Sequence, residues 1–425
     1  MLIFWKIVYN IFFIPLFWFV LLLLSFINKK AAKGVKGRYN LFEKLKKESA
    51  LLGGGKKIWF HSASMGEFEQ AKPIISLIKE KEPEIKIIVT FFSPSGYENN
   101  IKYKLADLIT YIPFDSFFNA SKFLDIIKPD IAIFMRYDVW PNFIWQLNKK
   151  NITSMLVDAT MSQDSSRKIP FIKNFHHHLF SAFSEILTVS EKDSNNFKDF
   201  NLTNVKIQAA GDTRYDQVYN RSLNAKHKNL LNQNIIGNKK IFVAGSSWKK
   251  DEEILFPAFL KLLEQHNNIL MILVPHEPTE KNLEEIEDEL KNRAAIIRFS
   301  NLDNYTNESI IIVDCIGLLV TLYSYGHVAY VGGGFGEGVH NVLEPAIYGI
   351  PVMFGPKNKN AQEAAELKKI GCGYEVVDEN DIYKNIFCFF NDDNACVESG
   401  RIAYKHVMGN IGASGNIFKK IMSYL

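Results

Sequence analysis

Short apolar runs alternate with amphipathic stretches along most of the chain. The runs are rich in β-branched and aromatic residues, and the stretches between them repeat apolar residues at helical spacing, as in Phe68–Lys79, Phe117–Ile127 and Asp193–Asp199. This rhythm predicts parallel strands joined by helices that cover both faces of a sheet. In the first half, strands are predicted at Lys57–Phe60, Ile85–Phe91, Leu108–Ile112, Ile131–Met135, Ile152–Val157, Ile186–Val189 and Val205–Ala209.

The pattern turns polar at Tyr219–Lys240 and then restarts. A chain of 425 residues is long for one domain, so a second domain is expected. We predict an α/β protein with Rossmann-like domains at 51–220 and 241–425, joined by a linker at 221–240. The second set of strands is predicted at Ile241–Ala244, Ile269–Val274, Ala295–Phe299, Ile310–Val313, Val328–Val331, Pro351–Phe354 and Tyr374–Val377.

The N-terminus does not follow this rhythm. Ile7–Ile27 contains no charged residue, and a helix of this length spans roughly 30 Å, the thickness of the hydrocarbon core of a bilayer. Eight Lys or Arg and one Glu follow between Asn28 and Lys47, which predicts that this flank stays in the cytoplasm. We therefore expect a transmembrane anchor at 1–28 and a basic juxtamembrane segment at 29–50. A cleaved signal peptide and a buried helix are the alternatives.

Composition adds little to this division. Apolar residues make up 47% of the chain and charged residues 23%, as is ordinary for a globular protein. The net charge is +4, and the four cysteines show neither CxxC pairing nor metal-ligand spacing, which favours reduced thiols in the cytoplasm. We expect no nucleic-acid partner and no obligatory protein partner.

Ligands of parallel sheets bind beyond the carboxyl ends of the strands, so the residues there are candidates for chemistry. In "HSASMGEFEQ", Glu67 follows the first predicted strand and stands where a helix begins. A carboxylate at that place can take a proton from an attacking hydroxyl. The alternative is a capping box between Ser64 and Glu67.

Two further strand ends carry opposite charges. "FMRYDVWPN" contains Arg136 and Asp138, and "AAGDTRYDQV" contains Asp212 and Arg214. The guanidinium of Arg214 suits a phosphate. The alternatives are an incidental ion pair in the first loop, and in the second a salt bridge from Arg214 to Asp212 or Asp216.

The second half of the chain offers phosphate and ribose ligands. "VAGSSWKKDEEI" leads from a strand through Ser246 and Ser247 into a helix whose first N–H groups suit a phosphate, although the spacing is not that of a Walker loop. Tyr330–Ala364 is rich in glycine, and four of its glycines, Gly332, Gly333, Gly334 and Gly336, are expected to let the backbone approach a ligand closely. His340 and Asn341 are expected to open a helix there, with Glu344 one turn later and able to accept two ribose hydroxyls.

In the order "HSASMGE", "WPN", "SEKDSNNF", "GDTRYD", "AGSSWKKDEE", "HNVLEPA" and "PVMFGPKNKN", the chain resembles the 3-deoxy-D-manno-octulosonic acid (Kdo) transferases over essentially its whole length. The resemblance implies the GT-B fold, two Rossmann-like domains facing a central cleft, with an anchor in the inner membrane. It implies CMP-Kdo as donor and a lipid A precursor of the lipid IVA type as acceptor. It further implies Glu67 as general base, assisted by Asp138, with Arg214 stabilising the departing phosphate.

The resemblance also implies where the nucleotide binds. Its contacts are expected at three segments besides the serine turn: His276 and Glu277; Gly317, Leu318 and Leu319; and Asn341, Val342, Leu343 and Glu344. The chain departs from the family at "VPHEP" (Val274–Pro278), at Gly317–Leu319, which lacks the usual acid, and at Thr160, where an arginine is usual. CMP offers one phosphate and no DxD-type motif is evident, so we expect neither a metal nor a cofactor.

Two other functions remain as alternatives. One is a sugar-nucleotide 2-epimerase on the same fold, which would need no access to lipid, so the anchor and its basic flank argue against it. The other is a non-catalytic, membrane-tethered binding protein. The presence of Glu67, Asp138 and Arg214 together argues against that interpretation.

Overall fold

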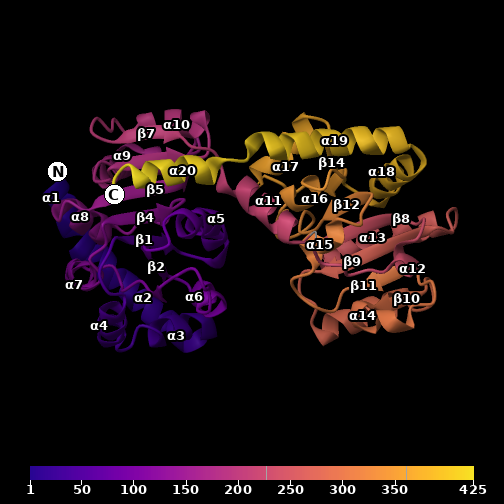
Figure 1. Ribbon diagram of the computed structural model, residues 1–425, viewed down its shortest axis with the longest axis horizontal. Coiled ribbons are helices and arrows are strands. Elements are labelled where there is room, and N and C mark those ends of the chain that lie inside the picture. The colour runs from indigo at the N-terminus through magenta and orange to yellow at the C-terminus, as the bar shows by residue number, and fades with distance from the viewer. Residues whose placement is uncertain (226, 360) are drawn as a thin grey trace. The chain divides into compact units, whose positions relative to one another are not determined.

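The computed structural model describes residues 1–225, 227–359 and 361–425. The chain forms two compact units, which Figure 1 shows as two groups of helices and strands. The first unit comprises Met1–Gln217 and Ile411–Leu425, and the second comprises Val218–Asn410.

The first unit contains a parallel sheet and the helices that cover it. Its strands are β1 (Lys57–Ser62), β2 (Lys86–Phe91), β3 (Leu108–Tyr111), β4 (Ile131–Met135), β5 (Thr153–Ala159), β6 (Glu185–Thr188) and β7 (Lys206–Ala209). Its helices are α1 (Leu2–Val8), the π-helical turn η1 (Tyr9–Phe13), α2 (Ile14–Ile27), α3 (Lys29–Lys36), α4 (Leu41–Leu51), α5 (Met65–Lys81), α6 (Pro94–Asn100), α7 (Phe117–Ile127), α8 (Pro141–Lys149), the 3-10 turn η2 (Ser166–Lys168), α9 (Pro170–Phe180), α10 (Glu191–Lys198) and α20 (Ala413–Met422). Helix α11 (Thr213–Ala225) begins in this unit and continues into the second.

The second unit repeats this plan. Its strands are β8 (Lys240–Ser247), β9 (Ile269–Pro275), β10 (Ile296–Arg298), β11 (Ile310–Ile312), β12 (Val328–Val331), β13 (Val352–Phe354) and β14 (Gly373–Glu375). Its helices are α12 (Gln233–Ile236), α13 (Lys249–Leu263), α14 (Glu280–Leu290), the 3-10 turn η3 (Phe299–Asn304), α15 (Leu319–Tyr323), α16 (Leu343–Ala346), α17 (Gln362–Lys369), α18 (Glu379–Asn391) and α19 (Asp393–Asn410).

Both sheets are parallel throughout the part of the chain that the structure describes. The strand orders are β3-β2-β1-β4-β5-β6-β7 and β10-β11-β9-β8-β12-β13-β14. Each strand expected from the apolar runs is present, with ends that differ by a few residues. The predicted α/β class with two Rossmann-like sheets is therefore confirmed.

The strands are apolar on both sides because helices cover both faces of each sheet. In β1, Ile58 and Phe60 pack on one face with α5 and α20, and Trp59 packs on the other face with α7 and α8. All of β4 is buried. This alternation fixes the register of β1 and thereby the direction in which the residues after it leave the sheet.

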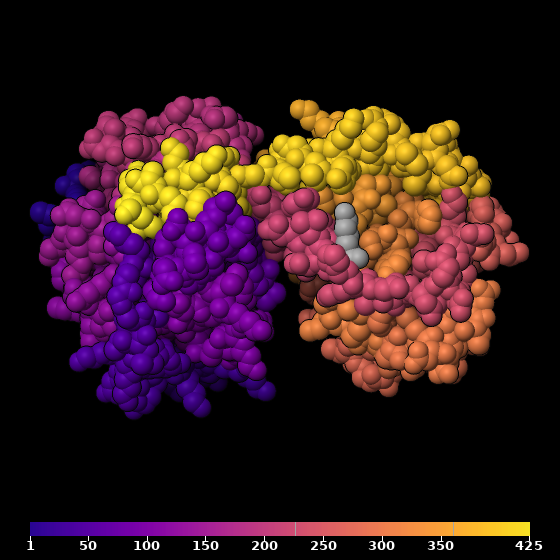
Figure 2. All heavy atoms as spheres, in the orientation of Figure 1, coloured from indigo at the N-terminus to yellow at the C-terminus, as the bar shows by residue number. Residues whose placement is uncertain are grey.

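The C-terminal helix differs from the expected division. Residues 411–425 were expected in the second domain, but α20 packs on the first sheet, where Ile417 and Ile421 are fully buried beside Ile74. Figure 2 shows α20 on the surface of the first unit. The apolar face of α20 fits this core, and Asp216 accepts hydrogen bonds from the backbone of Gly412 and Ser414 just before and within the helix.

The expected linker is also part of a compact unit. The second unit begins at Val218, within α11, and not after residue 220. Leu231 and Ile235, which lie in the segment expected to connect the domains, are buried. This segment therefore contributes to the core of the second unit.

The N-terminal segment is a continuous helical run. Within the described residues, Leu2–Ile27 is the one helix long and apolar enough to cross a membrane, with a mean hydropathy of 2.5. Trp5, Tyr9 and Ile14 are nevertheless buried against the first unit. One face of this helical run therefore packs against the rest of the first unit.

The glycine-rich turn after β12 supplies a test of packing. A Cβ at Gly332 would stand 2.1 Å from the backbone oxygen of Ser246, which no side-chain movement can relieve. We expect Gly332→Ala to destabilise the second unit by about 1–3 kcal/mol or more, because the two strand ends must separate. Thermal unfolding should show a lower Tm than for Gly336→Ala, where the nearest atom lies 3.9 Å away. Equal melting temperatures for the two variants would contradict this packing.

Candidate functional site

The parallel pairing of β1 with β4 places the loops after both strands at one edge of the first sheet. His61 is paired with Phe134 in this ladder, so the two strands end at nearly the same level of the sheet. Glu67 follows β1, and Asp138 follows β4. The edge therefore gathers the candidate acids of the first unit.

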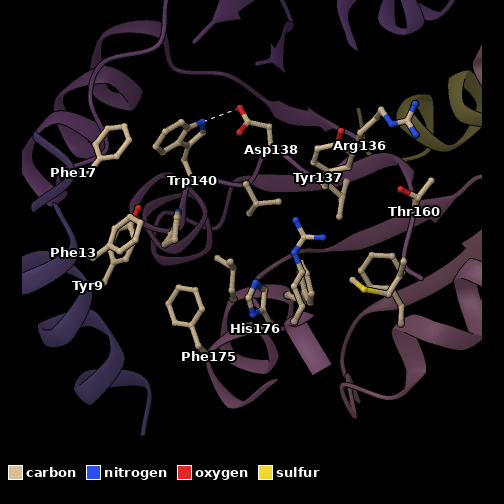
Figure 3. A pocket seen from close by; sticks show the side chains of 18 residues that line it. Tyr9, Phe13, Phe17, Arg136, Tyr137, Asp138, Trp140, Thr160, Phe175 and His176 are labelled. Atoms are coloured by element: carbon tan, nitrogen blue, oxygen red, sulfur yellow. Dashed lines mark hydrogen bonds between the residues drawn. The ribbon is translucent and has the colours of Figure 1, made fainter. Parts of the chain in front are cut away.

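His61 is fully buried at this edge and is bonded through both ring nitrogens. Its Nδ1 lies 2.9 Å from the hydroxyl of Thr90, and its Nε2 lies 2.9 Å from Oδ2 of Asp138. The indole N–H of Trp140 donates to the same oxygen of Asp138 at 3.0 Å, as the dashed line in Figure 3 marks. Asp138 is thus held by two donors.

The partners of His61 are themselves hydrogen-bonded. The indole of Trp59 donates to the hydroxyl of Thr90 at 2.8 Å, and that hydroxyl lies against Nδ1 of His61. The indole N–H of Trp140 lies within hydrogen-bond distance of Nε2 of His61, at 3.1 Å, as well as of Asp138.

Glu67 is buried at the start of α5 and closes a capping box with Ser64. One of its oxygens, Oε2, accepts the backbone N–H of Ala63 at 2.5 Å and that of Ser64 at 3.2 Å. Burial, and next the charge of Asp138, raise the pKa of Glu67, while the two amides and His61 oppose the rise. The alternative role as a cap is therefore present in the structure, and the carboxylate also belongs to the electrostatic cluster around Asp138.

Arg214 forms the salt bridge that was the alternative to phosphate binding. Its Nε and Nη2 both donate to Oδ2 of Asp212, at 3.0 Å and 2.6 Å. Asp212 in turn faces Asp158, a buried carboxyl that accepts hydrogen bonds from Thr213. Burial and the charge of Asp212 raise the pKa of Asp158. Arg214 thus belongs to a second polar group, built on the ends of β5 and β7.

A cavity of about 240 Å³ lies beside Asp138. Figure 3 shows Tyr9, Phe13 and Phe17 of the N-terminal helix on one side of it, with Trp140 next to Phe17 and with Arg136 and Thr160 on the other side. The remaining walls come from the loops after β4 and β5 and from α9, and they include Thr160, the departure from the family pattern noted above. The lining is mainly aromatic and aliphatic, with Arg136, Arg167 and His176 as its basic members.

Arg136 has an unusual backbone. Its φ is 61°, in the left-handed region, and its Nε is buried without a hydrogen-bond partner. Asp158, at the end of the next strand, has a φ of 53°. Non-glycine residues with such angles often occur at functional sites. Arg136 and Asp158 were not among the expected site residues, although the charged pair that includes Arg136 was visible in the sequence.

Asp115 connects the cavity to the N-terminal helix. It is buried and accepts hydrogen bonds from the hydroxyl of Tyr9 at 2.8 Å and from the backbone N–H groups of Asn142 and Phe143 at 3.1 and 3.2 Å. Burial outweighs these bonds and raises the pKa of Asp115 to about 7. The same carboxyl therefore caps α8 and holds the apolar helix. Its role was not visible in the sequence.

In the second unit, three rings stack beside the serine turn. His276 lies 4.5 Å from both Trp248 and His340, measured between ring centroids. The indole of Trp248 donates to Nε2 of His340 at 3.0 Å, and burial lowers the pKa of His340. His276 and Glu277 are exposed, and Ser247 is buried. The structure thus brings His276 close to the start of α13, as the donor-site prediction requires.

The serine turn is braced by carboxyl groups. The hydroxyl of Ser247 donates to Glu252 at 2.7 Å, and burial raises the pKa of Glu252 to about 7. Asp251 accepts the hydroxyl of Tyr330 and the backbone N–H groups of Trp248 and Gly333, at 2.7–2.9 Å. Ser246 precedes this network with a φ of 54°.

The glycines after β12 have a different role from the expected one. Gly332 lies against the backbone of Ser246, and Gly334 lies against that of Gly355, so close that neither site has room for a Cβ. They therefore permit the backbone to approach backbone, not a ligand. Only the surroundings of Gly336 are open enough for an added Cβ among Gly332, Gly333, Gly334 and Gly336.

The helix expected to begin at His340 or Asn341 begins later and is one turn long. It is α16, Leu343–Ala346, and the side chain of Asn341 accepts the N–H of Leu343 at 3.1 Å. Val342 and Leu343 are packed in the core. Glu344 is buried at 9% exposure and pairs with Nη1 of Arg221 from α11 at 2.7 Å.

Gly317, Leu318 and Leu319 lie between β11 and α15. Gly317 is exposed with a φ of 86°, and Leu318 and Leu319 are partly buried. The side chain of Leu319 packs near Gly245 at the end of β8. Across residues 1–225, 227–359 and 361–425, no group of three His, Cys, Asp or Glu is placed to hold a metal ion.

Two parallel Rossmann-like sheets with polar loops at their strand ends define a fold of the GT-B type. The fold is also found in the UDP-GlcNAc 2-epimerase of Neisseria meningitidis bound to UDP-GlcNAc, with a TM-score of 0.63 and 15% identity over 87% of this chain and 100% of that one. The UDP-GlcNAc 2-epimerase of Methanocaldococcus jannaschii has a TM-score of 0.58 and 17% identity over 87% of this chain and 99% of that one. At such identities the likeness concerns the fold alone.

Sequence similarity distinguishes the Kdo transferases from the 2-epimerases as relatives of this chain. Residues 33–217 match the model of the family described as 3-deoxy-D-manno-octulosonic-acid transferase (kdotransferase). The transferase of that name from Haemophilus influenzae is 28% identical over 418 residues, which cover 95% of this chain and 96% of that protein. The one from Chlamydophila psittaci is 28% identical over 370 residues, 85% and 82% of the two chains. Over most of its length the chain is therefore similar to the Kdo transferases.

Asp115 makes stability depend on pH in a defined direction. Its folded-state pKa, about 7, lies above the value of about 4 for an unfolded aspartate, so the folded protein holds the proton more tightly. The stability from this group is therefore complete below about pH 4 and is lost as the pH rises through 7, by up to about 1.4 kcal/mol per pH unit. Asp115→Asn removes the titration, and we expect its Tm to change less between pH 5 and 8 than that of the unmodified protein. Parallel curves of Tm against pH would contradict the assignment.

Proposed function

We propose that this protein transfers Kdo from CMP-Kdo to a hydroxyl of a lipid A precursor of the lipid IVA type, with inversion at the anomeric carbon. The match of residues 33–217 to the family model and the names of the relatives support the donor sugar and the reaction class. The observation that carries the mechanism is Glu67, a buried carboxyl of raised pKa at the strand edge that also bears His61 and Asp138.

In this mechanism, Glu67 takes the proton of the acceptor hydroxyl. The hydroxyl oxygen attacks the anomeric carbon from the side opposite CMP, and the bond to the phosphate oxygen breaks with its electron pair leaving on CMP. A raised pKa suits a base that must hold the proton once it has been transferred. Asp138, fixed by His61 and Trp140, assists at the same edge.

Arg214 stabilises the departing phosphate in this proposal. Asp212 accepts hydrogen bonds from Nε and Nη2 of Arg214 and so fixes the direction of the guanidinium, whose positive charge stabilises the charge that develops on the phosphate. CMP carries a single phosphate, and the proposed reaction needs neither a metal nor a cofactor.

The second unit holds the donor in this proposal. The turn at Ser246 and Ser247 and the stacked His276, next to Glu277, lie at the carboxyl ends of β8 and β9. Gly317–Leu319, Asn341 and Glu344 follow β11 and β12 and complete the nucleotide contacts, with Glu344 on the ribose. The side chains of Val342 and Leu343, which were expected among these contacts, pack in the core instead. Ligands of such sheets bind at these strand ends, which supports the assignment.

The protein acts at the inner membrane, with both units on the cytoplasmic side. One apolar helix and the basic segment after it support attachment to a membrane with anionic lipids. The sequence alone favours a single pass by this helix. The contacts of the helix favour the different arrangement described in the next subsection.

The reaction is tested by mass spectrometry of a lipid A precursor after incubation with the purified protein and CMP-Kdo. The expected product is heavier than the precursor by one or more Kdo units. An unchanged precursor, together with turnover of UDP-GlcNAc, would favour the 2-epimerase. An unchanged precursor with CMP-Kdo bound and not consumed would favour the non-catalytic binding protein.

Glu67→Gln separates the two roles of Glu67. Glutamine keeps an oxygen for the amides of Ala63 and Ser64, so the cap survives and the Tm should change little. Loss of a general base lowers the transfer rate by about 10²–10⁴-fold, while CMP-Kdo binding should persist. The control is Glu69→Gln, the same change two residues along α5, where the side chain pairs with Lys72. A stable Glu67→Gln protein that transfers Kdo at a near-normal rate would leave the cap as the complete explanation.

Glu344→Ala tests the donor site. Loss of a charged hydrogen bond to the ribose should weaken CMP binding by about 1–3 kcal/mol, measured by calorimetry. Glu337→Ala is the control, because Glu337 is exposed in the same segment. Arg221→Ala removes the partner of Glu344 and shows how far the ion pair itself contributes. Unchanged CMP affinity in folded Glu344→Ala protein would rule out the contact.

A further inference from the structure

The N-terminal apolar helix is held to the first unit near both of its ends. At the beginning, the indole N–H of Trp5 donates to the side chain of Asn174 on α9 at 2.7 Å. Beyond the other end, Arg38 is half-buried and donates to the backbone oxygens of Phe92 and Ile112, both at 2.8 Å. A residue near the start of Leu2–Ile27 and a residue after its end therefore contact the same compact unit.

Polar groups of the same helix are satisfied by the same unit. The hydroxyl of Tyr9 donates to Asp115, and the amides of Asn10 and Asn142 exchange two hydrogen bonds of 3.0 Å. Further along, the ring of Trp18 lies 4.0 Å from that of Phe114. One face of the helix is thus in contact with protein from residue 5 to residue 18.

The opposite face is exposed and apolar. Its most exposed side chains, between 60% and 83%, are Ile3, Ile11, Phe12, Leu16, Phe19, Phe26 and Ile27. The basic helix α3 begins two residues after this run, and the side chain of Asn28 caps it. An apolar face next to lysines fits a lipid leaflet with anionic headgroups.

A helix that crossed the bilayer would not keep these contacts. It would place Trp5 on the far side of the membrane from the first unit, which bears Asn174 and Asp115. It would also leave the hydroxyl of Tyr9 and the amide of Asn10 in hydrocarbon without partners, which is unfavourable. An interfacial helix normally has a polar face in water, and here the first unit takes the place of that water.

We propose that residues 2–27 lie in one leaflet, docked on the first unit, and do not cross the membrane. Met1 is then on the same side of the membrane as the two units. The proposal rests on the membrane attachment proposed above and is independent of the transferase reaction.

The docked helix also gives the cavity beside Asp138 a wall that touches lipid. Tyr9, Phe13 and Phe17 line the cavity (Figure 3). Phe12 and Leu16 of the same helix are exposed. A lipid-borne acceptor can therefore move from the leaflet along this helix to Asp138 without crossing water.

Two reporters on the full chain test the topology. Green fluorescent protein, which fluoresces in the cytoplasm, and alkaline phosphatase, which is active in the periplasm, are fused in turn before Met1 and after Leu425. The expected result is a cytoplasmic signal from both ends in a membrane-bound protein. A periplasmic Met1 with a cytoplasmic Leu425 would show a single pass and overturn the proposal. A protein found entirely in the soluble fraction would overturn it as well.

Cross-linking tests the docking itself. Asn10→Cys with Asn142→Cys, in a protein whose exposed Cys315 and Cys388 are replaced by serine, should be joined in native membranes by a short bifunctional thiol reagent. The control pair is Asn10→Cys with Asn148→Cys, since Asn148 is exposed on the same helix α8. Efficient joining of the first pair only is expected, and equal or absent joining in both pairs would contradict docking. Kdo transfer is assayed separately, so a failed reaction and a failed topology are distinguishable.

Discussion

Parallel pairing brings the carboxyl end of every strand in a sheet to the same edge, and the candidate site of the first unit depends on this constraint. His61 and Asp138 are 77 residues apart in the sequence and share a hydrogen bond of 2.9 Å because β1 and β4 are neighbours in register. Glu67 joins them as the first turn of α5 follows β1. Ile58 and Phe60 pack on one face of the sheet and Trp59 packs on the other, and this packing in turn holds β1 in that register.

Buried carboxyl groups then fix the loops that leave the sheets. Asp115 joins the start of α8 to the N-terminal helix, and Asp251 joins the starts of two loops in the second unit through Trp248 and Gly333. Each is satisfied by several donors, which keeps the cost of burying a carboxyl tolerable and makes the loop geometry unique. The residues that bear the proposed chemistry are therefore positioned by neighbours that perform none of it.

The sequence was sufficient to predict the strands, because a short continuous apolar run between two amphipathic helices is typical of a buried strand. The ends of these strands then indicated Glu67, Asp138 and Arg214 as candidate residues. It was insufficient where the deciding contact is distant. Helix α20 packs beside α5, which lies more than 300 residues earlier in the chain, so its helical pattern does not reveal the unit it joins. The same holds for Asp115, whose donor Tyr9 is 106 residues away. The glycines after β12 were misjudged because sequence shows a need for space but not what occupies it.

The double-sided character of the N-terminal helix matters for anyone who prepares this protein without detergent. Removing the helix would keep both sheets, but it would also strip Tyr9 from Asp115 and expose the aromatic cavity beside Asp138 to water. A soluble form is better sought by replacing outward side chains such as Ile11, Phe12 and Leu16 with polar ones, which leaves the inward face in place. Crystals or kinetics from a shortened chain would describe a site with one wall missing.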